Sequence, residues 1–188
     1  MSNVRILALV GSLRSGSHNR QLAEAAVKLA PEGVELEIFE GLSDIPFYNE
    51  DIDVPGQEPA AALKFREAAG QADGFLLFSP EYNGTIPAVL KNAIDWASRP
   101  MGEGVFVAKP IAIVGTAYGQ YGGVWAQDEA RKAAGIAGGA VLEDAKLSVP
   151  ESVIRFAERH PSDDTEITEK LAAVVKQLAD AASQPVAA

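Results

Sequence analysis

Serine, asparagine, arginine and glycine residues gather in one short stretch, residues 11–19 (GSLRSGSHN). The stretch follows an apolar run at Val4–Val10 and opens a helical pattern, so its backbone amides face the start of a helix. Amides at a helix N-terminus carry a positive partial charge and bind phosphate groups. The side chains that add donors or a cation are Ser12, Arg14, Ser17 and Asn19. The pattern therefore predicts a phosphate site, while a helix cap at Ser17 or Asn19 with a turn at Gly16 explains the composition equally well.

Two common phosphate motifs are absent from this stretch. It has no Gly-Lys-Ser/Thr, which disfavours ATP chemistry with magnesium, and it does not read Gly-x-Gly-x-x-Gly, which disfavours a dinucleotide. A monophosphate fits better. We interpret His18 as a solvated side chain or a hydrogen-bond donor rather than a catalyst.

Composition excludes several classes of function. The chain has 188 residues and a formal net charge of −10, and phosphate backbones and anionic lipids attract Lys and Arg, so neither nucleic acid nor a membrane is an expected partner. The chain has no Cys and only two His, which argues against a disulfide, a thiol nucleophile or a metal site. We see no signal peptide and no run of 18 apolar residues, so we expect a cytoplasmic protein.

Apolar periodicity alternates between short strands and longer helices. The predicted strands are Val4–Val10, Val34–Phe39, Gly74–Phe78, Pro110–Thr116 and Ala140–Val149. The predicted helices are His18–Ala30, Pro59–Ala72, Ile86–Ser98, Gly123–Ala137 and Thr165–Ala182. This alternation predicts one α/β domain over residues 1–182, with a five-stranded parallel sheet in the doubly wound order 2-1-3-4-5 and helices on both faces. Residues 183–188 are expected to form a disordered tail.

In this architecture ligands bind outside the carboxyl ends of the strands, at the switch point between the first and third strands. The loops after the first, third and fourth strands are therefore the expected site. The loop after the third strand begins PEYNGTIPAVLKNAIDW at Pro80, and the loop after the fourth strand contains Thr116-Ala117-Tyr118-Gly119.

Together, GSLRSGSHN and PEYNGTIPAVLKNAIDW resemble the NADPH-dependent FMN reductase family of flavodoxin-like proteins. The Gly-rich turn after the fourth strand and the segment Ile45–Asp51 (IPFYNED) agree with it. The resemblance covers roughly Val4 to Val149. A plain type I turn at Pro80–Gly84 is the competing interpretation of the most specific segment.

The resemblance implies a cofactor and gives residues roles. FMN would be bound through its phosphate by the stretch after the first strand, through its ring by the segment after the third, and on its other side by the turn after the fourth. The implied cofactor-binding residues are Ser12, Leu13, Arg14, Ser17, His18, Asn19, Pro80, Glu81, Tyr82, Asn83, Gly84, Thr116, Ala117, Tyr118 and Gly119. No catalytic side chain and no metal is implied, because the hydride chemistry belongs to the cofactor.

The implied activity is an oxidoreductase in which NADPH or NADH is the co-substrate and a small molecule accepts the electrons. The acceptor classes are quinones, free flavins, azo compounds and chromate. A flavodoxin-like electron carrier and a regulatory flavoprotein, both without intrinsic NAD(P)H oxidase activity, are the alternatives.

A homodimer or homotetramer is the expected assembly. The chain departs from the family pattern at Gly84, Ala117 and Trp125, which leaves the assembly and the substrate preference open. We interpret Trp125 as an interface anchor and Trp96 as core or dimer packing. Lys91 and Asp95 have the spacing of a solvated ion pair.

Two further segments stand out by their length or by their charge. Residues 41–57 form a connection long enough to be functional or to contact a partner, and its Phe47 and Tyr48 are candidates for burial against a second subunit. Residues 151–164 carry many charges and predict a solvated face.

Overall fold

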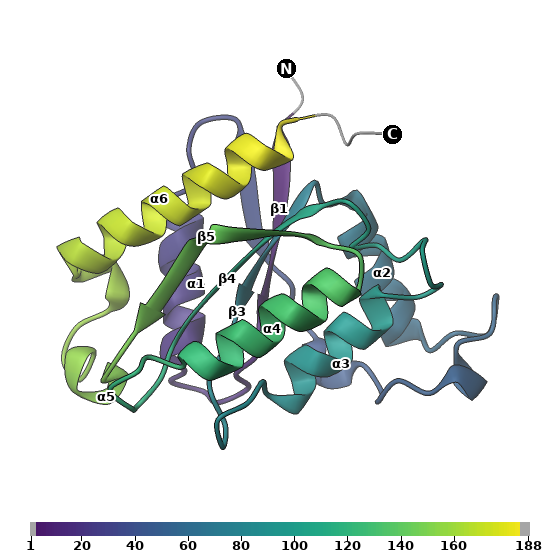
Figure 1. Cartoon of the computed structure of the whole chain (residues 1–188), viewed down its shortest axis with the longest axis horizontal. Coiled ribbons are helices and arrows are strands. Elements are labelled where there is room, and N and C mark those ends of the chain that lie inside the picture. The colour runs from purple at the N-terminus through teal and green to yellow at the C-terminus, as the bar shows by residue number, and fades with distance from the viewer. Residues whose placement is uncertain (1–2, 185–188) are drawn as a thin grey trace.

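The computed structural model describes residues 3–184 (Figure 1). Its strands are β1 (Val4–Val10), β2 (Val34–Ile38), β3 (Gly74–Phe78), β4 (Pro110–Thr116) and β5 (Ala140–Val149). Its α-helices are α1 (His18–Lys28), α2 (Ala60–Gln71), α3 (Ala88–Ala97), α4 (Val124–Ile136), α5 (Ser152–Arg155) and α6 (Thr165–Ala182). Short 3₁₀ turns lie at Leu42–Asp44, Glu50–Ile52 and Pro161–Asp163.

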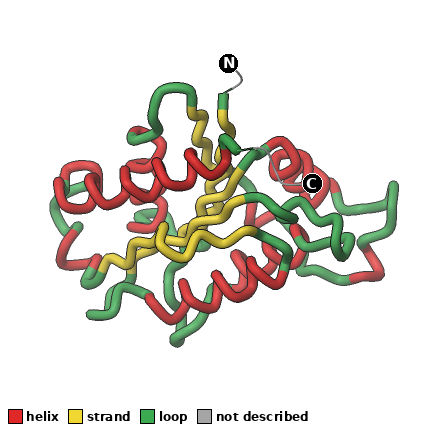
Figure 2. The backbone as a smooth tube through the Cα atoms, turned by 45° about the horizontal axis from the view of Figure 1, so that its top comes forward, coloured by secondary structure: helices red, strands yellow, loops and turns green. Residues whose placement is uncertain are grey.

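The five strands are all parallel and lie in the order β2-β1-β3-β4-β5, which confirms the predicted topology. Helices cover both faces of the sheet, so the strands run through the middle of the molecule (Figure 2). Helices α1 and α6 pack on one face, and α2, α3 and α4 pack on the other. This is the flavodoxin-like arrangement.

Alternate side chains of each central strand enter different cores. On β1, Ile6 and Ala8 pack with α1 and α6, whereas Leu7 and Leu9 pack with α2 and α3. Both faces of the strand are therefore apolar, which is why the sequence shows a continuous aliphatic run instead of the alternation of a half-exposed strand.

The predicted helices are present, with ends that differ by one or two residues. Helix α3 begins at Ala88 rather than Ile86, because Pro87 disfavours a helical conformation at the residue before it. Helix α1 ends at Lys28 with Leu29 as its cap, and α6 spans the predicted residues. In the predicted tail, Ser183 caps α6, and residues 185–188 lie outside the described part of the chain.

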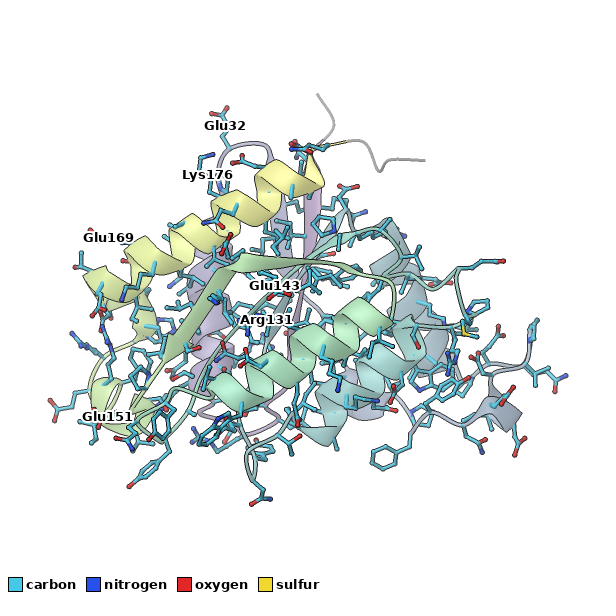
Figure 3. All side chains as sticks on the ribbon, viewed as in Figure 1. Glu32, Arg131, Glu143, Glu151, Glu169 and Lys176 are labelled. Carbon is cyan, nitrogen blue, oxygen red and sulfur yellow. The ribbon has the colours of Figure 1, made fainter. Side chains whose placement is uncertain are left out.

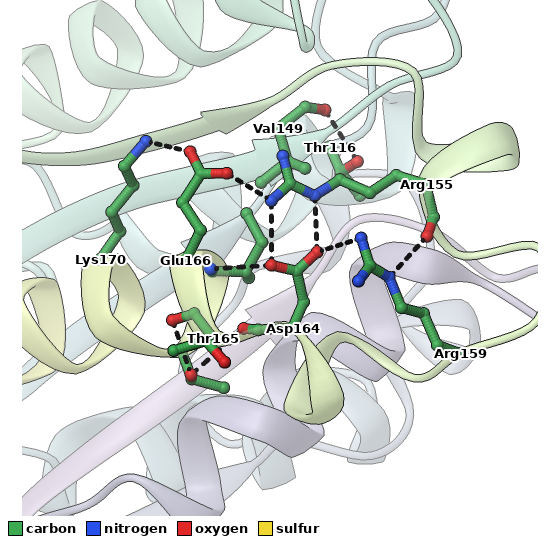
Figure 4. A network of polar contacts seen from close by, with 10 residues as sticks. Thr116, Val149, Arg155, Arg159, Asp164, Thr165, Glu166 and Lys170 are labelled. Carbon is green, nitrogen blue, oxygen red and sulfur yellow. Dashed lines mark hydrogen bonds and ion pairs between the residues drawn. The ribbon is translucent and has the colours of Figure 1, made fainter.

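Residues 151–164 are predicted as a solvated face, and this holds for Glu151, Glu158, Arg159 and Asp163 but is wrong for Asp164. The segment contains α5, and at its end the Asp164 side chain is only 4% exposed. Asp164 accepts two hydrogen bonds from Arg155, at 2.8 and 2.9 Å, and pairs with Arg159 at 2.7 Å (Figure 4). Three of the segment's charged side chains, Arg155, Arg159 and Asp164, therefore pair with one another and join α5 to α6.

Candidate functional site

The loops after β1, β3 and β4 meet at one edge of the sheet, because parallel strands end side by side. The amide of Gly11 donates to the carbonyl of Phe78, and the amide of Ser79 donates to Val114, both at 2.9 Å. A Cβ at Gly115 would lie 2.1 Å from the Ser79 carbonyl oxygen, so only glycine permits this approach. The hydrogen-bonded ladder thus continues past the strand ends into the loops.

The stretch after β1 forms a turn and then opens α1. The Ser17 amide donates to the Arg14 carbonyl, and the Ser17 side chain caps the helix by accepting from the Arg20 amide at 3.2 Å. The cap leaves the His18 and Asn19 amides without an intrahelical acceptor. Helix α1 has no acidic residue in its first turn, so nothing there repels an anion. The helix-cap and phosphate-site interpretations are therefore compatible.

Arg14 is exposed beside this turn. Its guanidinium lies 3.5 Å from the position of a Cβ on Gly16, and within residues 3–184 no carboxylate pairs with it. An anion placed over the turn would therefore meet an unpaired cation as well as backbone amides.

The Asn19 side chain joins two of the loops. Its side chain is only 5% exposed and bonds both backbone groups of Thr116: Nδ2 donates to the Thr116 carbonyl at 2.9 Å, and Oδ1 accepts from its amide at 3.0 Å. The Thr116 hydroxyl is also occupied, since it donates to Val149. The Asn19 side chain therefore joins the loops after β1 and β4, and what this residue offers an anion is its amide.

The segment after β3 makes a tight hairpin. Tyr82 and Thr85 exchange two backbone hydrogen bonds of 3.1 Å, and the central residues Asn83 and Gly84 have φ of 55° and 76°. Positive φ at both central positions is the requirement of a type I′ turn, so the competing type I interpretation is wrong. The turn holds Tyr82 half exposed at the edge of the sheet.

The Glu81 side chain points away from the hairpin toward α4. Its carboxylate accepts from the Ala126 amide at 3.3 Å, in the first turn of that helix. Gly123, at φ 82°, precedes the helix, and a Cβ there would lie 3.4 Å from Ala117 and 3.5 Å from Glu81. The carboxylate thus serves the helix N-terminus, and the backbone of Glu81 is the part that faces the site.

The loop after β4 is hydrogen-bonded to the start of α5. The amides of Glu151 and Ser152 donate to the carbonyls of Gly119 and Ala117, at 3.2 and 3.0 Å. Figure 3 shows Glu151 beside the carboxyl end of β5. Its φ of 53° is unusual for a residue with a Cβ and turns the chain into α5. Tyr118, between the two supported carbonyls, is 78% exposed.

His18 is half buried at the start of α1, and its ring meets the edge of Phe156 with 5.6 Å between centroids. Burial, followed by the nearby charge of Arg14, lowers the pKa of His18 below its usual value. The imidazole is therefore neutral at pH 7, in keeping with a structural or hydrogen-bonding role.

The structure brings the predicted residues to one edge of the sheet and adds residues that sequence reasoning missed. Glu151, Ser152 and Phe156 support the loops after β1 and β4, and Asp164 anchors the helix that carries them. An acid close in sequence to two arginines, Arg155 and Arg159, was the available signal, but sequence alone does not show which charges are buried.

Two cavities lie on the surface, one at this edge and one along α3 and α4. One, of about 580 Å³, opens between the loops after β1, β2 and β3 and is called here the Leu13–Phe47 pocket. Its lining includes Leu13, Arg14, Phe47, Tyr82, Val89 and Asn92. The other, of about 610 Å³, lies between α3 and α4 and is called here the helix groove; its lining includes Ile94, Met101, Val107 and Ile136.

Other predicted side chains are accounted for within one chain. Trp96 is fully buried in the core, and Lys91 pairs with Asp95 at 2.6 Å on the surface, as predicted. Tyr48 packs on the edge of Trp96, with 5.1 Å between ring centroids, so its ring needs no second subunit. Trp125 is 53% exposed and packs against Tyr121.

The residues at this edge fit the predicted cofactor. The start of α1 supplies free amides and an unpaired cation for a phosphate, and the Tyr82–Thr85 hairpin and the Ala117–Gly119 loop flank the adjoining space. Fold and site together define a flavodoxin-like flavin-binding protein.

Comparison with known proteins identifies the family. Residues 4–153 match NADPH-dependent FMN reductase, and the chain belongs to this family. Over 155 residues it is 41% identical to a 2-hydroxy-1,4-benzoquinone reductase of Burkholderia sp., covering 82% of this chain and 80% of that protein. It is also 41% identical to an NAD(P)H-dependent FMN reductase of Pseudomonas aeruginosa, covering 83% and 80%.

A solved structure agrees with this assignment. The flavoenzyme NAD(P)H:(acceptor) oxidoreductase FerB of Paracoccus denitrificans superposes with a TM-score of 0.83 at 28% identity, covering 95% of this chain and 97% of that one. The chain is therefore an oxidoreductase that uses FMN with NAD(P)H as the electron donor. Membership of an enzyme family favours this activity over an electron carrier or a regulatory flavoprotein.

Over residues 3–184, no helix has the length and apolar character needed to cross a membrane. In the same part of the chain, no cluster of His, Asp and Glu side chains is arranged to hold a metal ion.

Proposed function

We propose that the protein is an NAD(P)H:quinone oxidoreductase that carries out the net reaction NAD(P)H + H⁺ + quinone → NAD(P)⁺ + hydroquinone. The relatives named for benzoquinone and quinone reduction support this acceptor class. When bound, FMN accepts a hydride from the nicotinamide and passes two electrons to the acceptor. Free flavins, azo compounds and chromate are further acceptors to be tested.

The observation that carries the proposal is the meeting of three loops at the carboxyl edge of the sheet. We propose that Ser12, Arg14, Ser17 and the amides of His18 and Asn19 bind the phosphate of FMN. Pro80–Gly84 would lie along its ring, with backbone amides facing the ring edge. Thr116–Gly119 would line the opposite side through the backbone and the exposed Tyr118.

Each of these groups is held before a ligand arrives. The hairpin is closed by two hydrogen bonds, the Asn19 side chain fixes Thr116, and α5 fixes the carbonyls on either side of Tyr118. A site that is already ordered loses less conformational entropy on binding and holds the reacting groups in register.

The proposal is tested by loading the purified protein with FMN and titrating it anaerobically with NADPH and then with 2-methyl-1,4-naphthoquinone. We expect flavin absorbance near 450 nm to bleach with the nicotinamide and return with the quinone (about one equivalent of each). A protein that does not retain FMN, or whose absorbance is unchanged by NADPH and NADH, contradicts the proposal. Comparing the two nicotinamides also measures the donor preference.

We further propose that the chain forms a homodimer or homotetramer through the helix groove. Met101 and Ile136 line this groove and are 83% and 79% exposed, which is unfavourable in water unless a second copy covers them. Light scattering of the wild type and of Ile136→Asp tests this, and we expect the charged variant to dissociate. A wild type with the molar mass of a monomer contradicts the oligomer. An Ile136→Asp variant with the same molar mass as the wild type contradicts the helix groove as its interface. The single domain over residues 1–182 and the cytoplasmic location stay predictions.

A further inference from the structure

The Leu13–Phe47 pocket is not needed to hold a phosphate or to form the hairpin, yet it borders both. Leu13 and Arg14 belong to the turn before α1, and Tyr82 belongs to the hairpin after β3. Its volume of about 580 Å³ lies within the range of small-molecule sites. A molecule in this pocket would therefore lie beside the proposed cofactor.

One wall of the pocket is formed by Phe47, which the sequence singled out for burial against a second subunit. Its side chain is 77% exposed in the structure. The residues on either side are fixed to α3: the Tyr48 amide donates to Asn92 Oδ1 at 2.8 Å, and the Pro46 carbonyl accepts from Asn92 Nδ2 at 3.0 Å and from Trp96 Nε1 at 2.8 Å. Asn92 and Trp96 are themselves buried, at 6% and 0% exposure.

This arrangement presents an apolar ring on a rigid support. Three hydrogen bonds to two side chains of α3, Asn92 and Trp96, fix the backbone on both sides of Phe47, and no described contact buries the ring itself. The backbone that carries the ring is thus already ordered, and less conformational entropy is lost when a ligand binds. The pinned backbone is what a preformed binding wall requires.

Further apolar groups line the same pocket. Leu13 is 61% exposed and Tyr82 is 50% exposed. Water in contact with these side chains and with Phe47 is displaced favourably by an apolar ligand, and a flat ring also makes offset or edge contacts with the two aromatic rings.

Charge narrows the class of ligand. Arg14 and Asp44 both line the pocket, so its formal charges cancel. An oxyanion such as chromate gains no net attraction here, whereas an uncharged planar ring loses little on leaving water.

We propose that the Leu13–Phe47 pocket binds the ring of an uncharged quinone acceptor, and that Phe47 is its principal apolar contact. The inference rests on the proposed function and adds where the acceptor binds and which side chain contacts its ring. The acceptor gains two electrons and two protons and leaves as the hydroquinone, with the hydride supplied by the reduced nicotinamide and the second proton by solvent.

The test compares the FMN-loaded wild type with Phe47→Ala, Phe47→Leu and the control Leu63→Ala, which removes a 38% exposed side chain on α2. For Phe47→Ala we expect the KM for 2-methyl-1,4-naphthoquinone to rise roughly tenfold, since the ring's apolar contact is lost. Phe47→Leu should recover part of the loss. The anaerobic reduction rate with NADPH, and turnover with ferricyanide, an oxidant that needs no apolar contact, should stay within about twofold of the wild type.

A binding measurement separates this inference from the activity. Calorimetric titration of the oxidised protein with 1-naphthol, a planar ring that is not reduced, should give an affinity that falls roughly tenfold in Phe47→Ala and is unchanged in Leu63→Ala. Unchanged quinone KM and 1-naphthol affinity in Phe47→Ala overturn the inference, and so do equal losses with quinone and ferricyanide. A wild type that NADPH does not reduce contradicts the proposed function instead, while 1-naphthol binding still tests the pocket.

Discussion

The Asn19 side chain bonds both backbone groups of Thr116, a residue 97 positions away in the chain, at 2.9 and 3.0 Å. An amide is the one common side chain that both donates and accepts in a single plane, so it can replace a neighbouring strand at the end of β4. The start of α1 is thereby fixed to the loop that follows β4, and any ligand that needs both loops finds them in register.

Replacing Asn19 with Ala is expected to lower both stability and FMN affinity. The change leaves the amide and carbonyl of Thr116 buried without their partners, which should reduce the free energy of unfolding by about 1–3 kcal/mol. Urea unfolding of the protein without FMN measures this, and fluorescence titration measures FMN affinity. Asn19→Asp keeps an acceptor for the Thr116 amide but sets a second oxygen against the Thr116 carbonyl, so it should be no more stable than Asn19→Ala. Wild-type stability in Asn19→Ala would contradict the structural role.

Arg14→Ala should weaken FMN binding with little effect on folding. Arg14 is exposed and has no carboxylate partner among residues 3–184, so its removal breaks no ion pair in this part of the chain. A charge-assisted contact with a phosphate contributes about 1.5–3 kcal/mol, or roughly 10- to 150-fold in affinity. The dissociation constant of FMN and the melting temperature without FMN should be measured together.

Lys176→Ala is a control for this change, because it also removes one exposed cation but lies on α6, away from the strand ends. Riboflavin, which lacks the phosphate, should bind Arg14→Ala and the wild type alike. If Arg14→Ala loses affinity for riboflavin and FMN equally, Arg14 does not contact the phosphate, and this prediction is contradicted.

How far the sequence predicts this structure differs between backbone and side chains. The continuous apolar run of β1 and the Pro before α3 act locally, so the strands, the helices and their order follow from them. The carboxyl edge was also predictable, because parallel strands bring their ends together whatever the loops contain.

The partners of the buried polar side chains were not predictable. Asn19 looked like a phosphate donor, and nothing near it in sequence marks Thr116 as its partner. Residues 151–164 looked solvated because charge is normally solvated, while Arg155 and Asp164 satisfy each other in the fold. The turn at Asn83-Gly84 was predictable in principle, since Asn-Gly is typical of type I′ hairpins.

The role of Asn83 can be separated from the shape of its turn. Its φ of 55° is costly for most residues and free for glycine, so Asn83→Gly keeps the hairpin, whereas Asn83→Ala strains it by about 1 kcal/mol. If the Asn83 side chain contacts the flavin, both variants should lose FMN affinity or slow reduction by NADPH, and only Asn83→Ala should melt at a lower temperature. Wild-type FMN affinity and reduction rate in Asn83→Gly would restrict the residue to a role in the turn.

Asp164→Asn should destabilise the fold and loosen the FMN site in a pH-dependent way. The two hydrogen bonds from Arg155, more than any other contact, hold the pKa of the Asp164 carboxyl below its usual value. Because the pKa of the folded state is lowered, the ion pair stabilises the protein above the pKa of the unfolded state, near 4, and this contribution is lost as the pH falls through the folded-state pKa. At pH 7 we expect Asp164→Asn to lower the free energy of unfolding by about 1–3 kcal/mol, since Arg155 loses its buried carboxylate partner and keeps only the exposed Glu166.

The difference in unfolding free energy between the wild type and Asp164→Asn should therefore be largest near neutral pH and shrink below about pH 4. Asp180→Asn, which breaks an exposed pair with Lys176, is the matched control and should change little at any pH. Since α5 supports the Ala117 and Gly119 carbonyls, Asp164→Asn should also weaken FMN binding under conditions where the protein remains folded. If the stability difference between the wild type and Asp164→Asn is constant between pH 3 and pH 7, the charge of Asp164 does not contribute to stability, and the prediction is contradicted.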